Sequence, residues 1–260
     1  MTASALTHSV PPVPSRGLRA YLLGQFGFDA LIGLQRRLVY EVAGEPDTGA
    51  VIVCDHPSGI TVGREGSRIH VRPGPEELRT RGWSVRWVSR GGGAFLHLPG
   101  QVACYPVISL AQAGLTPARY VGELEAVVVD LLREFDLRAE PDPSTPGVRV
   151  GSRRVAHIGV AIRGGVSCFG LILNVDPDLE PFRDIYCDGD PMPMTSIQRE
   201  TPGRARVAAV RQQLVSLIAA RFAFDRISLF HTPPGPSLRP PFPPGSSGGG
   251  WKHAAPTRTR

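Results

Sequence analysis

The segment from Arg90 to Gln101, RGGGAFLHLPGQ, contains the residue types best suited to hold a ligand. Its three successive glycines allow the backbone to approach a ligand and to point N–H groups at a carbonyl or phosphate oxygen. Arg90 and His97 add polar side chains that could anchor such a ligand. Spacing alone is equally compatible with a flexible loop. The segment lacks the G-x-x-x-x-G-K-[ST] pattern, which excludes a phosphate-binding P-loop.

Two further segments combine residue types that could do chemistry. The stretch 159–174 places Gly170 inside an apolar strand, where a glycine indicates either close approach of a ligand or a β-bulge. The stretch 182–196, FRDIYCDGDPMPMTS, brings the thiol of Cys187 and the carboxylate of Asp188 into one loop. Because a neighbouring negative charge disfavours the thiolate, this segment alone favours Cys187 as a bystander.

Hydrophobic periodicity predicts the elements that must position these segments. Residues 28–40 have apolar side chains at helical spacing, and Pro117 can begin a second helix that runs to about Phe135. A third helix is predicted from about Gly203 to Phe222, with Val207, Val210, Leu214, Leu217 and Ile218 as its buried stripe.

The remaining apolar stretches predict strands, at 51–54, 83–88, 102–110, 147–150, 154–163 and 166–175. Gly151-Ser152 and Gly164-Gly165 separate the last three, as in β-hairpins. Meandering strands with segregated helices predict an α/β fold of the mixed α+β type, without regular βαβ alternation.

The length of 260 residues and the composition fit one folded domain with two tails. We expect a disordered leader at 1–16, the domain at 17–231, and a disordered tail, rich in proline and glycine, at 232–260. The chain has no apolar run long enough for a membrane span and no secretory signal pattern, so we expect a cytoplasmic protein.

Charge and cysteine usage exclude several classes of function. Four charges of the net +6 come from the acid-free tail, from Arg239, Lys252, Arg258 and Arg260, so we expect no nucleic-acid partner. Lys252 is the only lysine in the chain, which excludes a lysine-dependent mechanism inside the domain. The four cysteines form no C-x-x-C pair and predict free thiols, with neither a metal site nor a disulfide framework.

Taken together and in this order, the segments resemble the lipoyl(octanoyl) transferases, relatives of the lipoate and biotin protein ligases. The family pattern R-G-G-x-x-T-x-H-x-P-G-Q is matched by 90–101, and H-P-P-x-x-T-x-G-R by HPSGITVGR at 56–64. RVAHIG at 154–159 approximates K-I-A-x-[IL]-G, and FGLILNV at 169–175 approximates H-G-x-A-L-N-V. The resemblance covers about residues 20 to 225 and implies a ligase-like mixed sheet with flanking helices.

The resemblance implies octanoyl transfer from octanoyl-acyl carrier protein to a lysine of a lipoyl domain, without a cofactor or a metal. The implied acceptors are the lipoyl domains of 2-oxoacid dehydrogenases and the glycine cleavage carrier protein. An ATP-dependent lipoate ligase is disfavoured because that family needs a lysine where this chain has Arg154. The implied substrate-contacting residues are Arg90, Gly91, Gly92, Gly93, Ala94, Phe95, Leu96, His97, His157, Ile158, Gly159, Gly170, Leu171 and Ile172.

The departures from the family pattern fall at the catalytic positions. In the family, a cysteine in I-x-P-C-G forms an acyl thioester and the lysine of K-I-A-x-I-G lowers its pKa. Here Asp188 stands at the cysteine position, Cys187 at the preceding proline, and Arg154 at the lysine. Phe95 replaces the threonine of the first pattern, and Phe169 replaces the histidine of the last.

Three mechanisms are compatible with these substitutions, and we take Cys187, Asp188 and Arg154 as the candidate catalytic residues. In the first, the loop shifts by one residue so that Cys187 becomes the nucleophile and Arg154 stabilises its thiolate. In the second, Cys168 is the nucleophile. In the third, no covalent intermediate forms: Asp188 acts as a general base for direct lysine attack, or the protein binds acyl groups without turnover.

Overall fold

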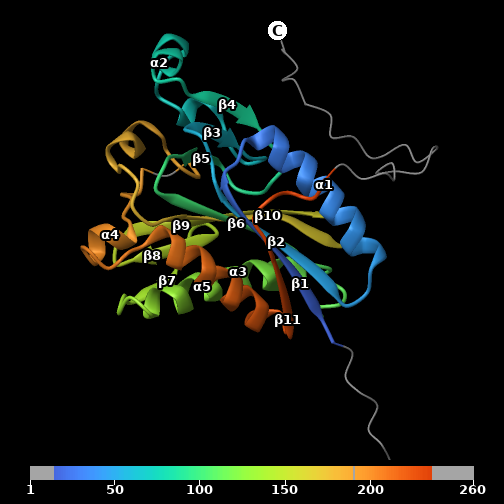
Figure 1. Ribbon diagram of the computed structural model, residues 1–260. Helices are drawn as coiled ribbons and strands as arrows, with labels where there is room; N and C mark the ends of the chain where they lie inside the picture. The colour runs from blue at the N-terminus through green and yellow to red at the C-terminus, as the bar shows by residue number, and fades with distance from the viewer. Residues whose placement is uncertain (1–14, 190, 236–260) are drawn as a thin grey trace, which may run out of the picture.

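An eight-stranded mixed sheet runs through the part of the chain that the computed structural model describes, residues 15–189 and 191–235. The strand order is β11-β1-β2-β6-β10-β9-β8-β7 (Figure 1). β1 is parallel to both β11 and β2, and the other pairs are antiparallel. The strands are β1 (Gly17–Gln25), β2 (Thr48–Asp55), β6 (Gln101–Val107), β7 (Ala139–Pro141), β8 (Gly147–Val150), β9 (Arg153–Arg163), β10 (Val166–Asn174) and β11 (Arg226–Phe230).

A second, three-stranded sheet carries the glycine-rich segment. Its order is β4-β3-β5, with β3 (Gly59–Val62) parallel to β4 (Ser84–Trp87) and antiparallel to β5 (Ala94–His97). The short helix α2 (Pro75–Thr80) and the 3-10 turn η1 (Arg68–His70) lie between β3 and β4 in the chain. The three successive glycines at 91–93 immediately precede β5, so this small sheet fixes where the glycine loop begins and ends.

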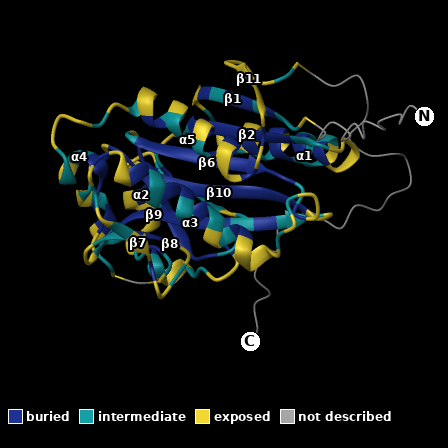
Figure 2. Ribbon diagram, turned by 90° about the horizontal axis from the view of Figure 1, so that it is seen from below, coloured by how far each residue is buried: buried dark blue, intermediate teal, exposed yellow. Residues whose placement is uncertain are grey.

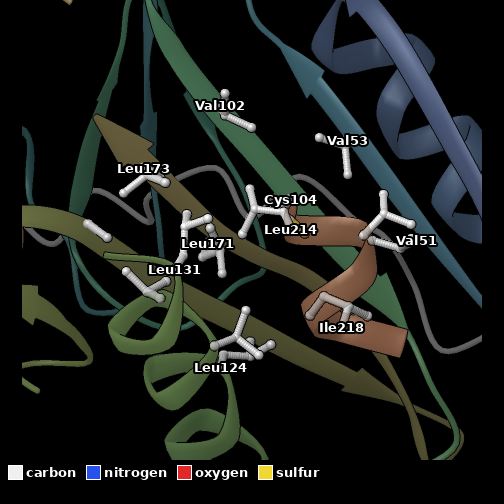
Figure 3. Packing of buried hydrophobic residues seen from close by; sticks show 14 of the residues in the cluster. Val51, Val53, Val102, Cys104, Leu124, Leu131, Leu171, Leu173, Leu214 and Ile218 are labelled. Atoms are coloured by element: carbon white, nitrogen blue, oxygen red, sulfur yellow. The ribbon is translucent and has the colours of Figure 1, made fainter. Parts of the chain in front are cut away.

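Three long helices cover the large sheet on its two faces (Figure 1). α1 (Phe28–Gly44) packs Leu31, Leu34 and Leu38 against one face, at the helical spacing that the sequence predicts. α3 (Pro117–Arg133) and α5 (Val207–Arg221) cover the other face, where their leucines and Ile218 meet the side chains of β2, β6 and β10 (Figure 3). Each fully buried leucine of these layers contributes about 1.5–3 kcal/mol through apolar burial.

Burial decreases from the centre of the large sheet to its edge at β11. β6 and β10 are buried along their whole length, whereas every residue of β11 is exposed (Figure 2). The short elements η2 (Glu180–Asp184) and α4 (Ile197–Glu200) follow β10 and flank the loop that carries Cys187 and Asp188. No helix of the described residues is long and apolar enough to cross a membrane.

The structure confirms most of the elements that periodicity predicts. α3 begins at Pro117, with the Thr116 hydroxyl accepting a hydrogen bond from the Arg119 amide at 3.3 Å. Gly164 and Gly165 have φ values of 54° and 78° and form the tight turn between β9 and β10. The third helix begins at Val207 and not near Gly203, because Gly203 has a φ of 80°, which is incompatible with a helix start.

Several elements do not show in the sequence pattern: β1, β3, β5, β7, β11 and α2. The predicted boundaries of the leader and the tail remain predictions, because residues 1–14 and 236–260 lie outside the described residues. The mixed α/β fold with a large mixed sheet and flanking helices is confirmed.

Candidate active site

The glycine loop packs against the end of β3 and against β9 through backbone hydrogen bonds. The Gly63 amide donates to the Gly93 carbonyl at 2.9 Å, and the Gly91 amide donates to the Val160 carbonyl at 2.8 Å. A Cβ at Gly159 would lie 2.7 Å from the Gly91 carbonyl oxygen, and one at Gly63 would lie 2.3 Å from a neighbouring loop carbonyl. These glycines therefore bring three chain segments to one place, and backbone contact leaves no room there for side chains.

Arg90 anchors the loop from inside. Its Nη2 donates to the Thr61 carbonyl at 3.0 Å and to the Thr61 hydroxyl at 2.9 Å, and its Nη1 donates to the Gly91 carbonyl at 2.9 Å. The guanidinium carbon lies 3.4 Å from the centroid of the Phe95 ring. Burial lowers the pKa of Arg90 to about 10, which still leaves it charged at neutral pH. Its donors serve the protein itself, so Arg90 positions the loop.

Asp188 joins the glycine loop to β9. Its Oδ1 accepts a hydrogen bond from the Gly93 amide at 2.7 Å, and its Oδ2 lies 3.0 Å from His157 Nδ1 and 3.4 Å from Arg154 Nη1. Burial raises the pKa of Asp188, but hydrogen bonds from His157 and Gly93 and the charge of Arg154 outweigh it, so the pKa is lowered overall. The carboxylate is therefore ionised at neutral pH.

Arg154 is fully buried and holds two carboxylates. Its Nη2 donates to Asp142 Oδ2 at 2.7 Å and to the Thr145 hydroxyl at 2.7 Å, while its Nη1 makes the longer contact with Asp188. Burial opposes ionisation of Asp142, but the hydrogen bonds from Arg154 and the Ser144 amide lower its pKa overall. Asp142 could not be predicted from the sequence, since nothing in its Pro-rich surroundings relates it to Arg154 on β9.

His157 completes a buried polar cluster that also contains Asp188, Arg154 and Asp142. Its side chain is buried, and its ring centroid lies 4.9 Å from that of Phe95. Burial lowers the pKa of His157, although the adjacent Asp188 raises it. Nδ1 is bound to Asp188, whereas Nε2 has no hydrogen-bond partner among residues 15–189 and 191–235.

The histidines of the two sequence motifs, His56 and His97, lie in a second buried network, which shares the Thr61 hydroxyl with Arg90. His97 Nε2 lies 2.8 Å from the Thr61 hydroxyl and thereby links β5 to β3. His56 Nδ1 lies 2.6 Å from the Phe26 carbonyl oxygen and its Nε2 lies 2.7 Å from the Tyr105 hydroxyl. Burial lowers the pKa of His56 to about 4 and that of His97 well below its usual range, so both rings are neutral at physiological pH.

The structure does not bring Cys187 to the Asp188 cluster, in contrast to the loop shift that the first mechanism requires. The Cys187 side chain is fully buried in the apolar core of the small sheet, together with Leu96 and Ile185. Burial raises the pKa of the Cys187 thiol to about 12. Cys168 lies under α1, donates to the Ala161 carbonyl at 3.4 Å, and has its pKa raised by burial to about 11. Both thiols are protonated and shielded, which disfavours nucleophilic attack by either.

Two of the other predicted substrate contacts, Ile158 and Leu171, lie away from the polar cluster and pack into the core under α3 and α5. Ile172 instead pairs with His157 between β10 and β9 and packs on the α1 side in the same core as Phe95. A Cβ at Gly170 would lie 2.2 Å from the Cys104 carbonyl oxygen, so this glycine allows β10 to approach β6. For Gly170 the structure therefore favours a local packing role over ligand contact.

The loop residues 91–95 border the cluster most closely. A Cβ at Gly92 would lie 2.9 Å from Asp188 Oδ1 and 3.4 Å from the Phe95 ring. Ala94 and Leu96 point into the buried core of the small sheet. No group of three or more His, Cys, Asp or Glu side chains that could hold a metal ion occurs among the described residues.

Comparisons with known proteins agree with this architecture. Residues 30–219 match the family described as the lipoyl protein ligase A/B catalytic domain. In structure, the chain is similar to a lipoate protein ligase from Thermoplasma acidophilum with bound lipoic acid, with a TM-score of 0.62 and 18% identity over 84% of this chain and 89% of that one. A lipoate-protein ligase A bound with ATP gives a TM-score of 0.62 at 17% identity, over 84% and 88% of the two chains.

Curated relatives are more similar in sequence. The chain is 37% identical to an octanoyltransferase of Syntrophobacter fumaroxidans over 70% of this chain and 81% of that one. It is 35% identical to an octanoyltransferase of Chloroflexus aurantiacus over 81% and 96%. It is also 30% identical to a mitochondrial octanoyltransferase of Arabidopsis thaliana over 82% and 92%.

The chain belongs to the lipoyl protein ligase A/B catalytic domain family. The mixed sheet and the glycine loop agree with this class of protein. Within this family, the similarity to these relatives identifies the chain as an octanoyltransferase, an acyltransferase of protein lipoylation. The resemblance inferred from the sequence motifs is thereby confirmed.

Proposed function

We propose that the chain transfers an octanoyl group from acyl carrier protein directly to a lipoyl-domain lysine, without a cysteine thioester intermediate. The observation that carries this proposal is the position of Asp188, whose carboxylate lies among Arg154, His157 and the glycine loop. The buried Cys187 takes no part in the reaction. As in the third mechanism that the sequence allows, no covalent intermediate forms.

Direct transfer needs no enzyme nucleophile, because the donor is already a thioester. The acceptor amine attacks the thioester carbonyl, a C–N bond forms, and the C–S bond breaks to release the carrier thiol. The protein must orient the two substrates and accept the proton that the attacking amine loses. The Asp188 cluster, next to the glycine loop, supplies groups for the proton transfer.

The proposed partners are octanoyl-acyl carrier protein as donor, and the lipoyl domains of 2-oxoacid dehydrogenases and the glycine cleavage carrier protein as acceptors. Support comes from the octanoyltransferase relatives. The proposed compartment is the cytoplasm, where thiols stay reduced, and all four cysteines of the chain are free.

The experiment is intact mass spectrometry of the purified chain after incubation with octanoyl-acyl carrier protein, followed by addition of a lipoyl domain. We expect no octanoyl adduct on the protein but an octanoyl group on the lipoyl domain. Cys187→Ser and Cys168→Ser should transfer as the wild type does, and Asp188→Ala should lose transfer. An adduct that disappears only in Cys187→Ser would refute direct transfer and establish a displaced nucleophile.

A second candidate function is acyl binding without turnover. It is favoured by the burial of the two side chains, since those of Asp188 and His157 are 4% and 1% exposed. Under this alternative the wild type would protect octanoyl-acyl carrier protein from hydrolysis and would transfer nothing to the lipoyl domain.

A further inference from the structure

Asp188 itself is poorly placed to accept a proton from the substrate amine. Both of its oxygens already accept hydrogen bonds, Oδ1 from Gly93 and Oδ2 from His157. Arg154 lies 3.4 Å from Oδ2 and adds a positive charge that opposes protonation. A carboxylate held in this way is stable as the anion, so a different group must take the proton.

The contact between Asp188 and His157 fixes the tautomer of the imidazole. An ionised carboxylate can only accept hydrogen bonds, so the proton of the neutral ring must reside on Nδ1. Nε2 then carries an unshared electron pair and can accept a proton. This is the arrangement by which an aspartate orients a catalytic histidine in hydrolases, here without a nucleophile on the distal side of the ring.

Nε2 is also the unsatisfied atom of the cluster. It is buried, and no atom of the described residues forms a hydrogen bond with it. Leaving a buried polar group unpaired costs about 1–3 kcal/mol, so such an atom calls for a partner that arrives with the substrate. The cluster lies close to the surface, since Gly189, the residue after Asp188, is exposed, and so are Arg64 and Glu65 beside the glycine loop.

We infer that His157 is the general base of the acyl transfer, and that Asp188 is the residue that positions it. This inference rests on the proposed function and deepens it by assigning the proton transfer to one atom. The deprotonated lysine amine attacks the thioester carbonyl, and Nε2 removes a proton from the nitrogen as the tetrahedral intermediate forms. The intermediate expels the carrier thiolate, the imidazolium returns the proton to that sulfur, and the amide and the free carrier thiol leave.

The charges around His157 suit this cycle. Asp188 stabilises the imidazolium that forms during the reaction, whereas Arg154 and Arg90 oppose it and His97 contributes a neutral ring. Burial and the two arginines lower the pKa of His157, so the ring is neutral and able to accept a proton at physiological pH.

The test measures transfer by the full chain, from octanoyl-acyl carrier protein to a lipoyl domain, across the pH range from about 5 to about 9, which brackets the ordinary histidine pKa. His157→Gln keeps a donor for Asp188 but cannot accept the proton, so kcat/KM should fall by about 10²- to 10⁴-fold while KM for the lipoyl domain stays unchanged. The acidic limb of the wild-type pH profile should disappear in this variant. Asp188→Asn should also lower the rate, and the double variant should be no slower than His157→Gln.

The matched control is His231→Gln, an exposed histidine outside the site, which should retain the wild-type rate and profile. Suppose that the wild type transfers the octanoyl group and that His157→Gln keeps both the transfer rate and the acidic limb of the pH profile. The inference about His157 is then wrong, and the proposed function stands. If the wild type transfers nothing at any pH, both fail together.

A second measurement needs neither activity nor a variant. The ¹⁵N chemical shifts of the His157 ring in the labelled full chain report which nitrogen carries the proton. We expect the Nδ1–H tautomer with a bare Nε2 at neutral pH. The Nε2–H tautomer would overturn the inference, even if His157→Gln did not fold.

Discussion

Replacement of Arg154 by methionine should destabilise the fold by leaving two buried carboxylates short of a partner. The side chains of Asp142 and Asp188 are 0% and 4% exposed, and Arg154 itself is 0% exposed. Removing one member of a buried ion pair typically costs about 3–5 kcal/mol. With a urea m-value of about 3 kcal/mol/M, the unfolding midpoint should fall by roughly 1 to 1.7 M.

The pH dependence of this loss follows from the pKa shifts. In the wild type the pKa values of Asp142 and Asp188 are lowered, so their contribution to stability is present above the ordinary aspartate pKa of about 3.9 and is lost as the pH falls through the lower folded values. In Arg154→Met, burial without the arginine raises the folded pKa of Asp142, which penalises folding at neutral pH. The difference between the two proteins should therefore be largest near pH 7 and shrink toward pH 4.

The assay is urea unfolding followed by circular dichroism at pH 7 and at pH 4.5. Arg154→Met combined with Asp142→Leu should recover part of the loss, because a buried pair replaced by apolar groups is often neutral in stability. Arg79→Met, which removes an exposed pair with Glu76, should change stability by less than about 1 kcal/mol. An equal loss at both pH values, or a double variant no more stable than the single one, would refute the electrostatic explanation.

Three further outcomes are expected. Asp188→Cys combined with Arg154→Lys restores the residue pair of the family and should produce an octanoyl thioester on the chain, visible by intact mass, whereas Asp188→Cys alone should acylate more slowly. Gly159→Ala should destabilise by about 1–3 kcal/mol in thermal unfolding, because its Cβ would lie 2.7 Å from the Gly91 carbonyl oxygen, while Gly122→Ala on the open face of α3 should stabilise by about 0.5–1 kcal/mol. Alkylation of Cys187 by iodoacetamide in the native chain should be negligible at pH 8, since burial raises the pKa of its thiol to about 12, and should become rapid in denaturant. Equal destabilisation by both glycine variants, or alkylation of the native thiol, would contradict these expectations.

The helices and the central strands could be predicted because their signal is local. α1 and α3 repeat apolar residues at helical spacing, and Thr116 with Pro117 fixes a helix start within two residues. β11 could not be predicted in the same way. Its five residues are all exposed, and its existence depends on pairing with β1, about 200 residues earlier in the chain.

The candidate site was only partly accessible from the sequence. The resemblance located the glycine loop, Asp188 and Arg154, and the structure brings these together. The sequence does not show which way the Cys187 side chain points. Neighbouring residues of an extended segment point to opposite sides, and a β-bridge between Ala94 and Cys187 determines which of them faces the core. The pairing of Arg154 with Asp142 joins β9 to a loop that precedes β8, and no local pattern encodes it.

The two substitutions at the catalytic positions, Arg154 and Asp188, change the chemical role of His157 on β9. A lysine and a cysteine can both exchange protons near neutral pH in a suitable environment, but an arginine keeps its charge and an aspartate with a lowered pKa keeps its own. The exchange of both residues therefore preserves a charge pair and removes proton transfer from it. His157 occupies the variable position of the family's K-I-A-x-[IL]-G pattern, 3.0 Å from that aspartate, and it is the group of the cluster that can still gain and lose a proton. In the mechanism that we propose, this histidine carries out the proton transfer that the family assigns to the cysteine and lysine positions.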